Sequence, residues 1–412
     1  MSGEWDWEYI TDYVSQSPRL YSEWWLSLVH NNPEHVIVET ALIAFIVYIL
    51  VVKKTLNPKG SSTQKLNLTV KEMADLVEEW QPEPLVPPLG EEERDVAENI
   101  PVVEKADGAY LSVQGLSKPL LNMATFDFLG MGQQTEMKEA AVKALNKYGC
   151  GSCGPRGFYG TIDVHMKMEE EIAAFMATPE AISYSDSAST IASAIPAFSK
   201  KGDLILADQG VEEATQKGLN LSRSTVRWFR HNDMDHLEQL LQDIEREDRE
   251  LKRNALEQRR FIVVDGLYRN YGDTCPLPRL LELKAKYRYR VVLNESLSFG
   301  ALGANGRGLT EMHGVSADCV EILTLSMAHA LASIGGLCIG SREIIDHQRL
   351  SAAGYCYSAS APPFVNAAAI AALHMLRERP QLLATLRENA AFLHTEIAKI
   401  PGLKVGGDSY KL

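Results

Sequence analysis

An alternation of short apolar runs with helical runs, starting near residue 95, constrains the fold of this chain most. The apolar runs include "AISYS", "DLILAD", "RFIVVDGLY", "YRVVLNES" and "EILTLSM", and between them lie helix-like runs such as "MKEAAVKALNKYG" and "PLPRLLELKAKY". Strands that alternate with helices are typical of a mostly parallel sheet covered by helices. The sequence therefore predicts a large α/β domain over residues 95–345.

The length and charge of the chain narrow the class of protein. Its 412 residues accommodate one large α/β domain with appendages, since single cores stop growing at about 250–300 residues. The formal net charge of -13 argues against a general nucleic-acid-binding protein, so we expect no nucleic-acid partner.

The cysteines indicate reduced thiols in the cytosol. They lie downstream of the most apolar segment and lack the dense spacing of a secreted disulfide framework. Cys150 and Cys153 form a C-x-x-C pair, but no second pair or nearby group of histidines completes a zinc site. We expect a packing role for these thiols and no metal.

The most apolar segment, "VIVETALIAFIVYILVV" at 36–52, predicts one transmembrane helix over residues 35–53. At about 1.5 Å per residue it nearly crosses a hydrocarbon core of roughly 27 Å. A re-entrant or interfacial helix is an alternative. A cleaved signal peptide is disfavoured because the chain starts with the acidic run "MSGEWDWEYITDYV" rather than a short basic region.

The lysines beside this segment predict its orientation. Lys53 and Lys54 follow it directly, whereas basic side chains are scarce before it, so the positive-inside rule makes residues 1–34 lumenal and the bulk of the chain cytosolic. Tyr21, Trp24 and Trp25 suit an interfacial aromatic belt or, equally well, a helix packed on a partner protein. Residues 54–94 are expected to be a linker with a helix-like run, followed by the proline-rich arm "QPEPLVPPLGEEE".

Ligands of open parallel sheets bind beyond the carboxyl ends of the strands, so the residues there carry the strongest functional signal. The runs "YGCGSCGPRGFYGTIDVH" (148–165), "FIVVDGLYRNYGDTCPLPRLLELKAKYRYRVVLNESLSFGALGANGRG" (261–308) and "ASIGG" (332–336) resemble the α-oxoamine synthases. Within that family, the chain is similar to the first subunits of the serine palmitoyltransferases. The similarity covers most of residues 70–405.

This resemblance implies a fold and a chemistry. The fold is the pyridoxal-phosphate transferase fold type I, which is aspartate-aminotransferase-like, with a mainly parallel seven-stranded sheet, a smaller carboxyl-terminal domain and active sites shared between two chains. Members condense an amino acid with an acyl-CoA and release carbon dioxide. A lysine holds pyridoxal phosphate as a Schiff base, an aspartate pairs with the ring nitrogen, and a histidine stacks on the ring.

The groups that hold the cofactor in the family are replaced at four positions of this sequence. Asn294 stands where the family has the aspartate, and Leu297 replaces a histidine of the same strand end. His329 occupies the Schiff-base position, counted six residues before Gly335, and imidazole cannot form that bond. Glu212 aligns with the stacking histidine. Asp186 also brings negative charge to a helix start that would otherwise suit a phosphate. We expect no pyridoxal phosphate bound covalently to this chain.

A chain without cofactor chemistry can still complete the active site of its partner. The loop "GSCGPRGFYGT" is the first candidate, through Cys153, Gly154, Arg156, Phe158, Tyr159 and Gly160, with a forked cation and apolar walls. A turn that packs on its own domain is the alternative, and Cys153 could be an ordinary buried thiol. Ser358 and Ser360 in "YSASAPP" are the second candidate, with surface hydroxyls in a turn equally plausible.

The resemblance implies a non-catalytic but required subunit of serine palmitoyltransferase in the endoplasmic reticulum membrane. The complex would condense L-serine with palmitoyl-CoA, with pyridoxal phosphate held by a lysine-bearing subunit 2 and small membrane activators and regulators alongside. One alternative is an independent acyltransferase that uses Lys200, Lys201 or Lys217 for the aldimine. A second is a structural or inhibitory membrane scaffold.

The carboxyl-terminal segment departs from the family pattern. The sequence ends at "GLKVGGDSYKL", where family members continue into further strands and helices, so residues 346–412 are expected to form an incomplete small domain. A strand at 403–405 would lack its neighbours, and apolar surface on "AAFLHTEIAKI" would be uncovered. We expect weak or absent assembly for this shortened form.

Overall fold

The computed structural model describes residues 22, 23, 26, 27, 30, 33–56, 68–253 and 257–407. The chain divides into two compact units, residues 1–98 and 99–412, which are described separately. Most of the predicted lumenal segment 1–34 and part of the predicted linker, 57–67, lie outside the described residues.

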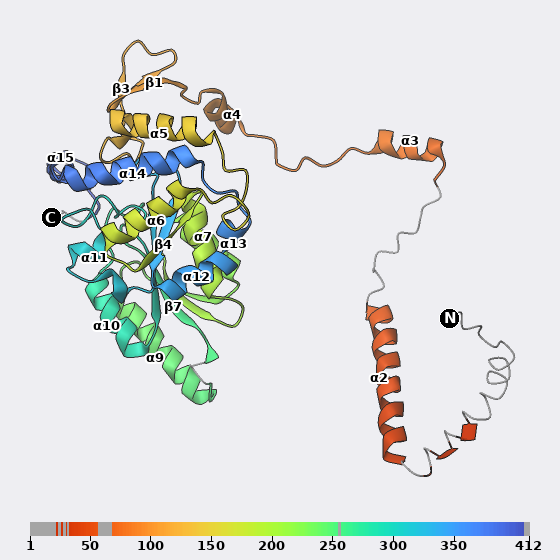
Figure 1. Cartoon of the computed structure of the whole chain (residues 1–412). Coiled ribbons are helices and arrows are strands. Elements are labelled where there is room, and N and C mark those ends of the chain that lie inside the picture. Colours follow the sequence, from red (N-terminus) through yellow and green to blue (C-terminus); the bar gives the residue numbers. More distant parts are fainter. Residues whose placement is uncertain are drawn as a thin grey trace, which may run out of the picture. The chain divides into compact units, whose positions relative to one another are not determined.

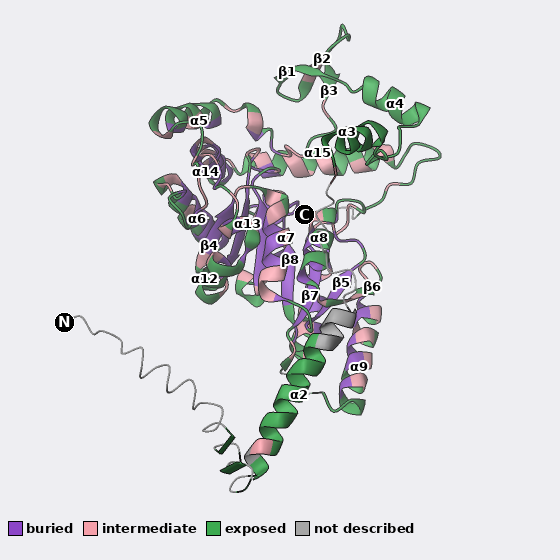
Figure 2. Ribbon diagram, turned by 90° about the vertical axis from the view of Figure 1, so that its right-hand side faces the viewer, coloured by how far each residue is buried: buried purple, intermediate pink, exposed green. Residues whose placement is uncertain are grey.

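From Pro33 onward, the described residues of the first unit form helices α2 (Pro33–Leu56), α3 (Val70–Glu79) and α4 (Glu91–Glu98). Thr69 begins α3 with a reciprocal capping box, in which its hydroxyl accepts from the backbone of Glu72 and the Glu72 carboxylate accepts from the backbone of Thr69. The described part of α2 exposes its large apolar side chains, green in Figure 2, among them Ile37, Leu42 and Phe45.

The helix predicted at 35–53 is present as part of α2, but its membrane role is not confirmed. Among the described residues, no helix is both long enough and apolar enough to cross a membrane. The side chains of residues 51–56 in this helix lie outside the described set.

A seven-stranded sheet forms the centre of the second unit (Figure 1). Its order is β4-β10-β9-β8-β7-β5-β6, with β10 antiparallel to both neighbours and the pairs from β9 to β6 parallel. The strands are β4 (Glu180–Tyr184), β5 (Leu204–Asp208), β6 (Thr225–Phe229), β7 (Arg260–Asp265), β8 (Arg290–Asn294), β9 (Ile322–Ser326) and β10 (Gly336–Gly340). Every residue of β5, β7, β9 and β10 is buried, as expected of strands covered by helices on both faces.

Helices cover this sheet, and Figure 2 shows the buried residues gathered on the strands and on the inner faces of the helices. In α9, the buried Met234, Leu237, Leu241 and Ile244 recur at spacings of three and four, which gives the helix one apolar face. The helices of this unit are α5 (Thr135–Tyr148), α6 (Asp163–Met176), α7 (Ser187–Phe198), α8 (Glu213–Ser222), α9 (Met234–Glu250), α10 (Leu277–Tyr287), α11 (Leu309–Met312), α12 (Arg342–Ser351), α13 (Ala353–Cys356), α14 (Pro363–Glu378) and α15 (Gln381–Ile397), with short 3-10 turns η1 (Met131–Gln133) and η3 (Ala317–Cys319).

A small antiparallel sheet precedes the large one. It consists of β1 (Val103–Asp107), β2 (Tyr110–Val113) and β3 (Leu120–Leu121), in that order. Figure 1 shows α5 and α14 side by side, and α14 also packs on α6.

The predicted α/β fold with a mainly parallel seven-stranded sheet is confirmed, and each quoted apolar run contains a strand. The strand predicted at 403–405 is wrong, because these residues are irregular and no neighbouring strand offers them hydrogen bonds. The uncovered apolar surface is present, since Phe392 and Leu393 on α15 are exposed. The predicted boundary at residue 346 falls inside α12, which packs on β4 and α7.

Candidate functional site

A cavity of about 380 Å³ lies beyond the carboxyl ends of the parallel strands, where this type of sheet binds ligands. Glu212 and His329, two of the four positions that the resemblance marks as replaced, line this cavity. Asn294 does not line it but donates a hydrogen bond to Glu212. The lining residues are Ser187, Ala188, Glu212, Glu213, Ala214, Lys217, Arg269, Asn270, Ser296 and His329.

The Asn294 side-chain amide connects Glu212 by hydrogen bonds to the buried residues at the strand ends. Its Nδ2 donates to Glu212 Oε1 at 2.7 Å and to Asp265 Oδ1 at 3.2 Å. Its Oδ1 accepts from the hydroxyls of Ser296, at 2.6 Å, and Thr324, at 3.2 Å. Both ends of the buried amide are therefore satisfied by the chain itself.

Asp265, at the end of β7, is a buried acid whose importance the sequence analysis missed. It accepts from the backbone N–H of Glu212 at 2.7 Å and from the Thr215 hydroxyl at 3.2 Å. Burial, with the nearby Glu212 carboxylate adding to it, raises the pKa of Asp265 to about 8, so the acid is mostly protonated at neutral pH. Its place at a strand end was the signal that could have found it.

His329 lies at the cavity wall with its ring fixed by two contacts. Its Nδ1 donates to the backbone oxygen of Ser296 at 2.8 Å, and its ring meets Phe126 edge to face at 5.3 Å between centroids. Burial lowers the pKa of His329, which favours the neutral ring. A neutral, tethered imidazole offers neither an amine nor a fixed positive charge. Leu297 is buried and offers only hydrocarbon.

The cations of the cavity already have carboxylate neighbours. Lys217 pairs with Glu213 at 2.8 Å, and Arg269 lies 3.7 Å from Glu212 and over the Phe126 ring. Lys217 is the one lysine that lines the described cavity. Lys200 and Lys201 precede β5 and so lie at its opposite, amino end.

The residues at the positions implied by the family resemblance do not fit pyridoxal phosphate held as a Schiff base. The position that the resemblance assigns to the Schiff-base lysine holds the imidazole of His329, and the one that it assigns to the ring-nitrogen acid holds the amide of Asn294. At the start of α7, where a phosphate would bind, the Asp186 carboxylate accepts from the backbone N–H groups of Ala188, at 3.2 Å, and Ser189, at 2.7 Å.

The glycine-rich loop and the segment 357–363, the two predicted shared-site regions, are joined to each other. The buried Ser360 hydroxyl lies within hydrogen-bond distance of the carbonyl oxygens of Gly154, at 2.8 Å, and Gly160, to either of which it can donate its one hydrogen. The Ser152 hydroxyl donates to the Ser360 carbonyl at 2.8 Å. A Cβ on Gly160 would overlap the carbonyl oxygen of Gly154. This close approach explains why the loop needs glycine at that position.

Arg156 of this loop is held in a buried ion pair. Its guanidinium is buried and forms a two-point pair with Glu169, at 2.7 and 3.0 Å, and it also donates to Ser183 at 2.7 Å. The forked cation is therefore used within its own domain, since a buried guanidinium must be paired. This geometry is the one that the loop's alternative, packing on its own domain, predicts for Arg156, and its role at a shared site stays a prediction.

The other loop candidates face outward. Phe158 is 70% exposed and Tyr159 is 102% exposed with a φ of 63°, a left-handed conformation rare for aromatic residues. Cys153 is exposed rather than buried and has a φ of 57°. Ser358, in the second candidate segment, is half-buried, and its hydroxyl lies 3.2 Å from that of Ser185. Gly154 is the remaining candidate. Its carbonyl oxygen takes part in the hydrogen bonds that connect Ser360 to the base of the loop, which we call the Ser360 joint.

A histidine held between two acids is a further cluster that the sequence analysis missed. His231 contacts Asp208 through Nδ1 at 2.9 Å and Asp273 through Nε2 at 3.0 Å, and its ring stacks on Tyr271. These residues tie together the loops after β5, β6 and β7. The acids are separated in sequence, so only the fold brings them to one imidazole.

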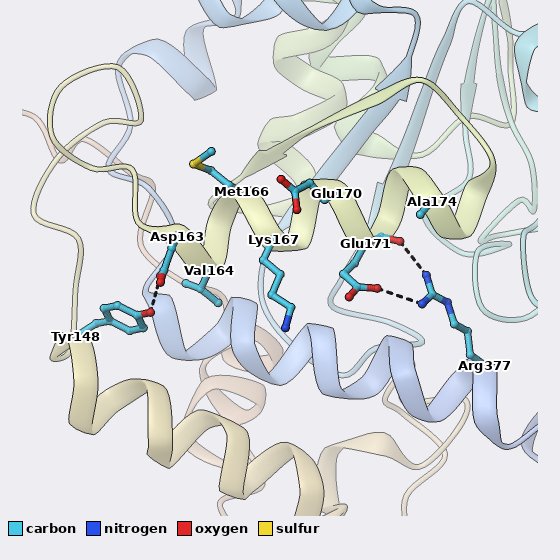
Figure 3. A pocket seen from close by; sticks show the side chains of 9 residues that line it. All are labelled: Tyr148, Asp163, Val164, Met166, Lys167, Glu170, Glu171, Ala174 and Arg377. Carbon is cyan, nitrogen blue, oxygen red and sulfur yellow. Dashed lines mark hydrogen bonds and ion pairs between the residues drawn. The ribbon is translucent and has the colours of Figure 1, made fainter.

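A second hollow, of about 710 Å³, runs along α6 and α14 (Figure 3). Two contacts lie along it: Tyr148 donates to Asp163, and Arg377 donates to Glu171 at 3.1 Å. None of the predicted site residues lines it.

Comparison with known proteins identifies the family. The model of the family "Aminotransferase class I and II" matches residues 118–410. "Long chain base biosynthesis protein 1c" of Oryza sativa subsp. japonica is 46% identical over 374 residues, which cover 91% of this chain and 74% of the relative. "Serine palmitoyltransferase 1" of Dictyostelium discoideum is 40% identical over 372 residues, which cover 90% of this chain and 75% of the relative. The chain belongs to the serine palmitoyltransferase family.

More distant relatives and solved structures agree with this assignment. "Serine palmitoyltransferase 1" of Saccharomyces cerevisiae is 36% identical, with 96% of this chain and 70% of the relative covered. The Sphingomonas wittichii serine palmitoyltransferase superposes with a TM-score of 0.69 at 25% identity, covering 76% of each chain. The S. paucimobilis enzyme with a bound PLP–myriocin aldimine gives a TM-score of 0.69 at 24% identity, covering 76% of this chain and 79% of that one. The second similarity supports the fold alone.

Proposed function

We propose that the chain is the non-catalytic but required subunit of a serine palmitoyltransferase and completes the active site of a lysine-bearing subunit 2. The complex would condense L-serine with palmitoyl-CoA to 3-ketodihydrosphinganine, CO₂ and CoA, the step that begins sphingolipid synthesis. The observation that carries this proposal is the tethered, neutral His329 at the position where a Schiff base needs an amine.

The exposed loop around Phe158 and Tyr159 supports a role at a shared site. The Ser360 joint fixes the base of this loop, while its aromatic side chains extend into solvent. Rigid exposed aromatic side chains are favoured at protein interfaces because they bury a large area with few rotatable bonds. We assign Phe158 and Tyr159 to contacts with subunit 2, with Cys153 and Ser358 beside them.

The membrane role of the first unit is part of the proposal. The exposed apolar side chains of α2 need an apolar environment, and the lysines that follow favour a cytosolic location for the rest of the chain. We propose a single-pass anchor in the endoplasmic reticulum, which brings the site near its acyl substrate, and contacts with small membrane activators and regulators. Retention of the full chain in the membrane pellet after alkaline extraction tests this point, and release into the supernatant contradicts it.

Co-expression tests the main proposal. The full chain alone, subunit 2 alone and the two together are assayed for serine-dependent condensation with palmitoyl-CoA. We expect activity only for the pair, at a level set by how far the two chains assemble, with the internal aldimine on subunit 2. Equal activity of subunit 2 by itself would reject the required role.

Loop variants test the shared site. The pair Phe158→Ala and Tyr159→Ala is expected to lower co-purification and turnover, while Leu221→Ala, an exposed apolar change on α8, leaves both unchanged. Unaltered turnover of the loop variant would favour the scaffold alternative instead.

An independent enzyme is the second candidate, because Lys217 lines the cavity. If Lys217 formed an aldimine, the purified single chain would absorb near the internal-aldimine band, and borohydride would abolish that band. Loss of the band in Lys217→Gln would then establish this alternative.

A further inference from the structure

Two carboxylates of this chain lie where the fold would receive an anionic cofactor. One belongs to Asp186 at the start of α7, and the other belongs to Glu212 before α8. We propose that these carboxylates, Glu212 in the cavity wall and Asp186 next to the lining residues Ser187 and Ala188, keep pyridoxal phosphate and related anions out of the cavity.

The start of α7 supplies the first part of the argument. Backbone N–H groups at a helix start attract phosphate because their hydrogens have no partner within the helix. Here Asp186 accepts from two of them, at Ala188 and Ser189. Ser187 and Ala188 line the cavity. A ligand there would therefore meet a helix start whose N–H groups at Ala188 and Ser189 are already hydrogen-bonded, and whose capping side chain is negatively charged.

Glu212 supplies the second part. Its Oε1 accepts from Asn294 Nδ2 at 2.7 Å, which links the cavity wall to the end of β8. The same carboxylate lies 3.7 Å from the Arg269 guanidinium. Glu212 therefore already interacts with the Asn294 amide donor and the Arg269 guanidinium, two groups that a bound anion would need.

The charge balance of the lining completes the argument. Two cationic side chains, Lys217 and Arg269, line the cavity. Lys217 pairs with Glu213, and Arg269 lies beside Glu212. His329 is favoured in its neutral form by burial. An entering phosphate dianion would have to break one of these pairs and approach the Asp186 carboxylate as well.

This inference deepens the proposed absence of cofactor chemistry, but the two can fail separately. His329 would still lack an amine if the cavity admitted an anion. Conversely, a cavity closed by its own carboxylates is compatible with any role for the rest of the chain.

Binding measurements on the full chain test the inference. The probes are inorganic phosphate and 4-deoxypyridoxine phosphate, which has no aldehyde and cannot react with surface lysines. The test variant combines Asp186→Ser, which keeps a hydroxyl cap, with Glu212→Gln, which keeps a hydrogen-bond acceptor. Asp233→Ser is the matched control, because Asp233 caps α9 in the same way, with its carboxylate accepting from His236.

We expect the double variant to bind both probes at least about tenfold more tightly than the wild-type chain, since removal of two negative charges frees charge-assisted hydrogen bonds. Asp233→Ser should bind like the wild type. Tight binding of the analogue to the wild type, or a folded double variant that gains no affinity, would overturn the inference. If circular dichroism shows that the double variant does not fold, each single variant is measured instead. A lack of any gain in probe affinity in both single variants would likewise overturn the inference.

Discussion

The glycine-rich loop and the cavity at the strand ends are both built from buried polar groups, but they balance charge differently. In the loop region, Arg156 is matched by Glu169 in a two-point pair. At the cavity, Asp265 and Glu212 are two acids close together, and the nearest arginine lies 3.7 Å from Glu212. The first arrangement holds the structure together, whereas the second keeps one acid protonated, a feature typical of functional sites.

The buried pair offers the strongest test of this comparison. Glu169→Gln leaves Arg156 without a countercharge in the interior, and we expect a loss of about 3–5 kcal/mol in the free energy of unfolding. Urea unfolding of the full chain measures it. Glu170→Gln, on the exposed side of α6, is the matched control and should change little. A loss for Glu169→Gln no larger than the control's would show that the loop region does not depend on the pair.

The Ser360 joint below the loop gives a smaller effect. Gly160→Ala places a methyl group against the Gly154 carbonyl oxygen and the Ser360 hydroxyl, so we expect a loss of about 1–3 kcal/mol, the usual range for overpacking. Gly157→Ala is the control, because its Cβ meets nothing within 4 Å. Equal melting temperatures for the two variants would contradict the close packing.

Asp265, the buried acid at the cavity, predicts that the free energy of unfolding depends on pH. Asp265 has a pKa of about 8 in the folded chain but about 3.9 when unfolded, so the folded state holds a proton that the unfolded state has lost between these values. Stability from this group is therefore complete below about pH 4 and falls as pH rises toward 8.

Asp265→Asn removes this ionisation and should reduce the fall in the free energy of unfolding between pH 5 and pH 7 by roughly 2–3 kcal/mol. Urea unfolding at the two pH values gives the slope, with Asp235→Asn, on α9, as the control. A wild-type slope that Asp265→Asn leaves unchanged would place the origin of the pH dependence elsewhere.

The tip of the loop should affect stability least. Tyr159 is fully exposed in a left-handed conformation that glycine adopts freely, but glycine also loses more entropy on folding. The two effects oppose each other, so Tyr159→Gly should change the free energy of unfolding by no more than about 0.5 kcal/mol. A much larger loss would mean that the side chain packs on its own domain.

The sequence by itself determined the fold class, and its resemblance to the α-oxoamine synthases implied the positions where cofactor groups are replaced. Buried strands such as β5 and β7 are continuous apolar runs, and the identity of His329 or Asn294 is read directly from the chain. These features are local, so neighbouring residues are enough to predict them.

The tertiary structure decided how polar groups are paired. It turned Arg156 inward to Glu169, brought Asp265 beside Glu212, and placed His231 between Asp208 and Asp273. It also left residues 403–405 irregular, because a strand needs a neighbour. Such pairings join residues far apart in the sequence, and the cost of burying an unpaired charge, which selects them, arises only once the chain has folded around it.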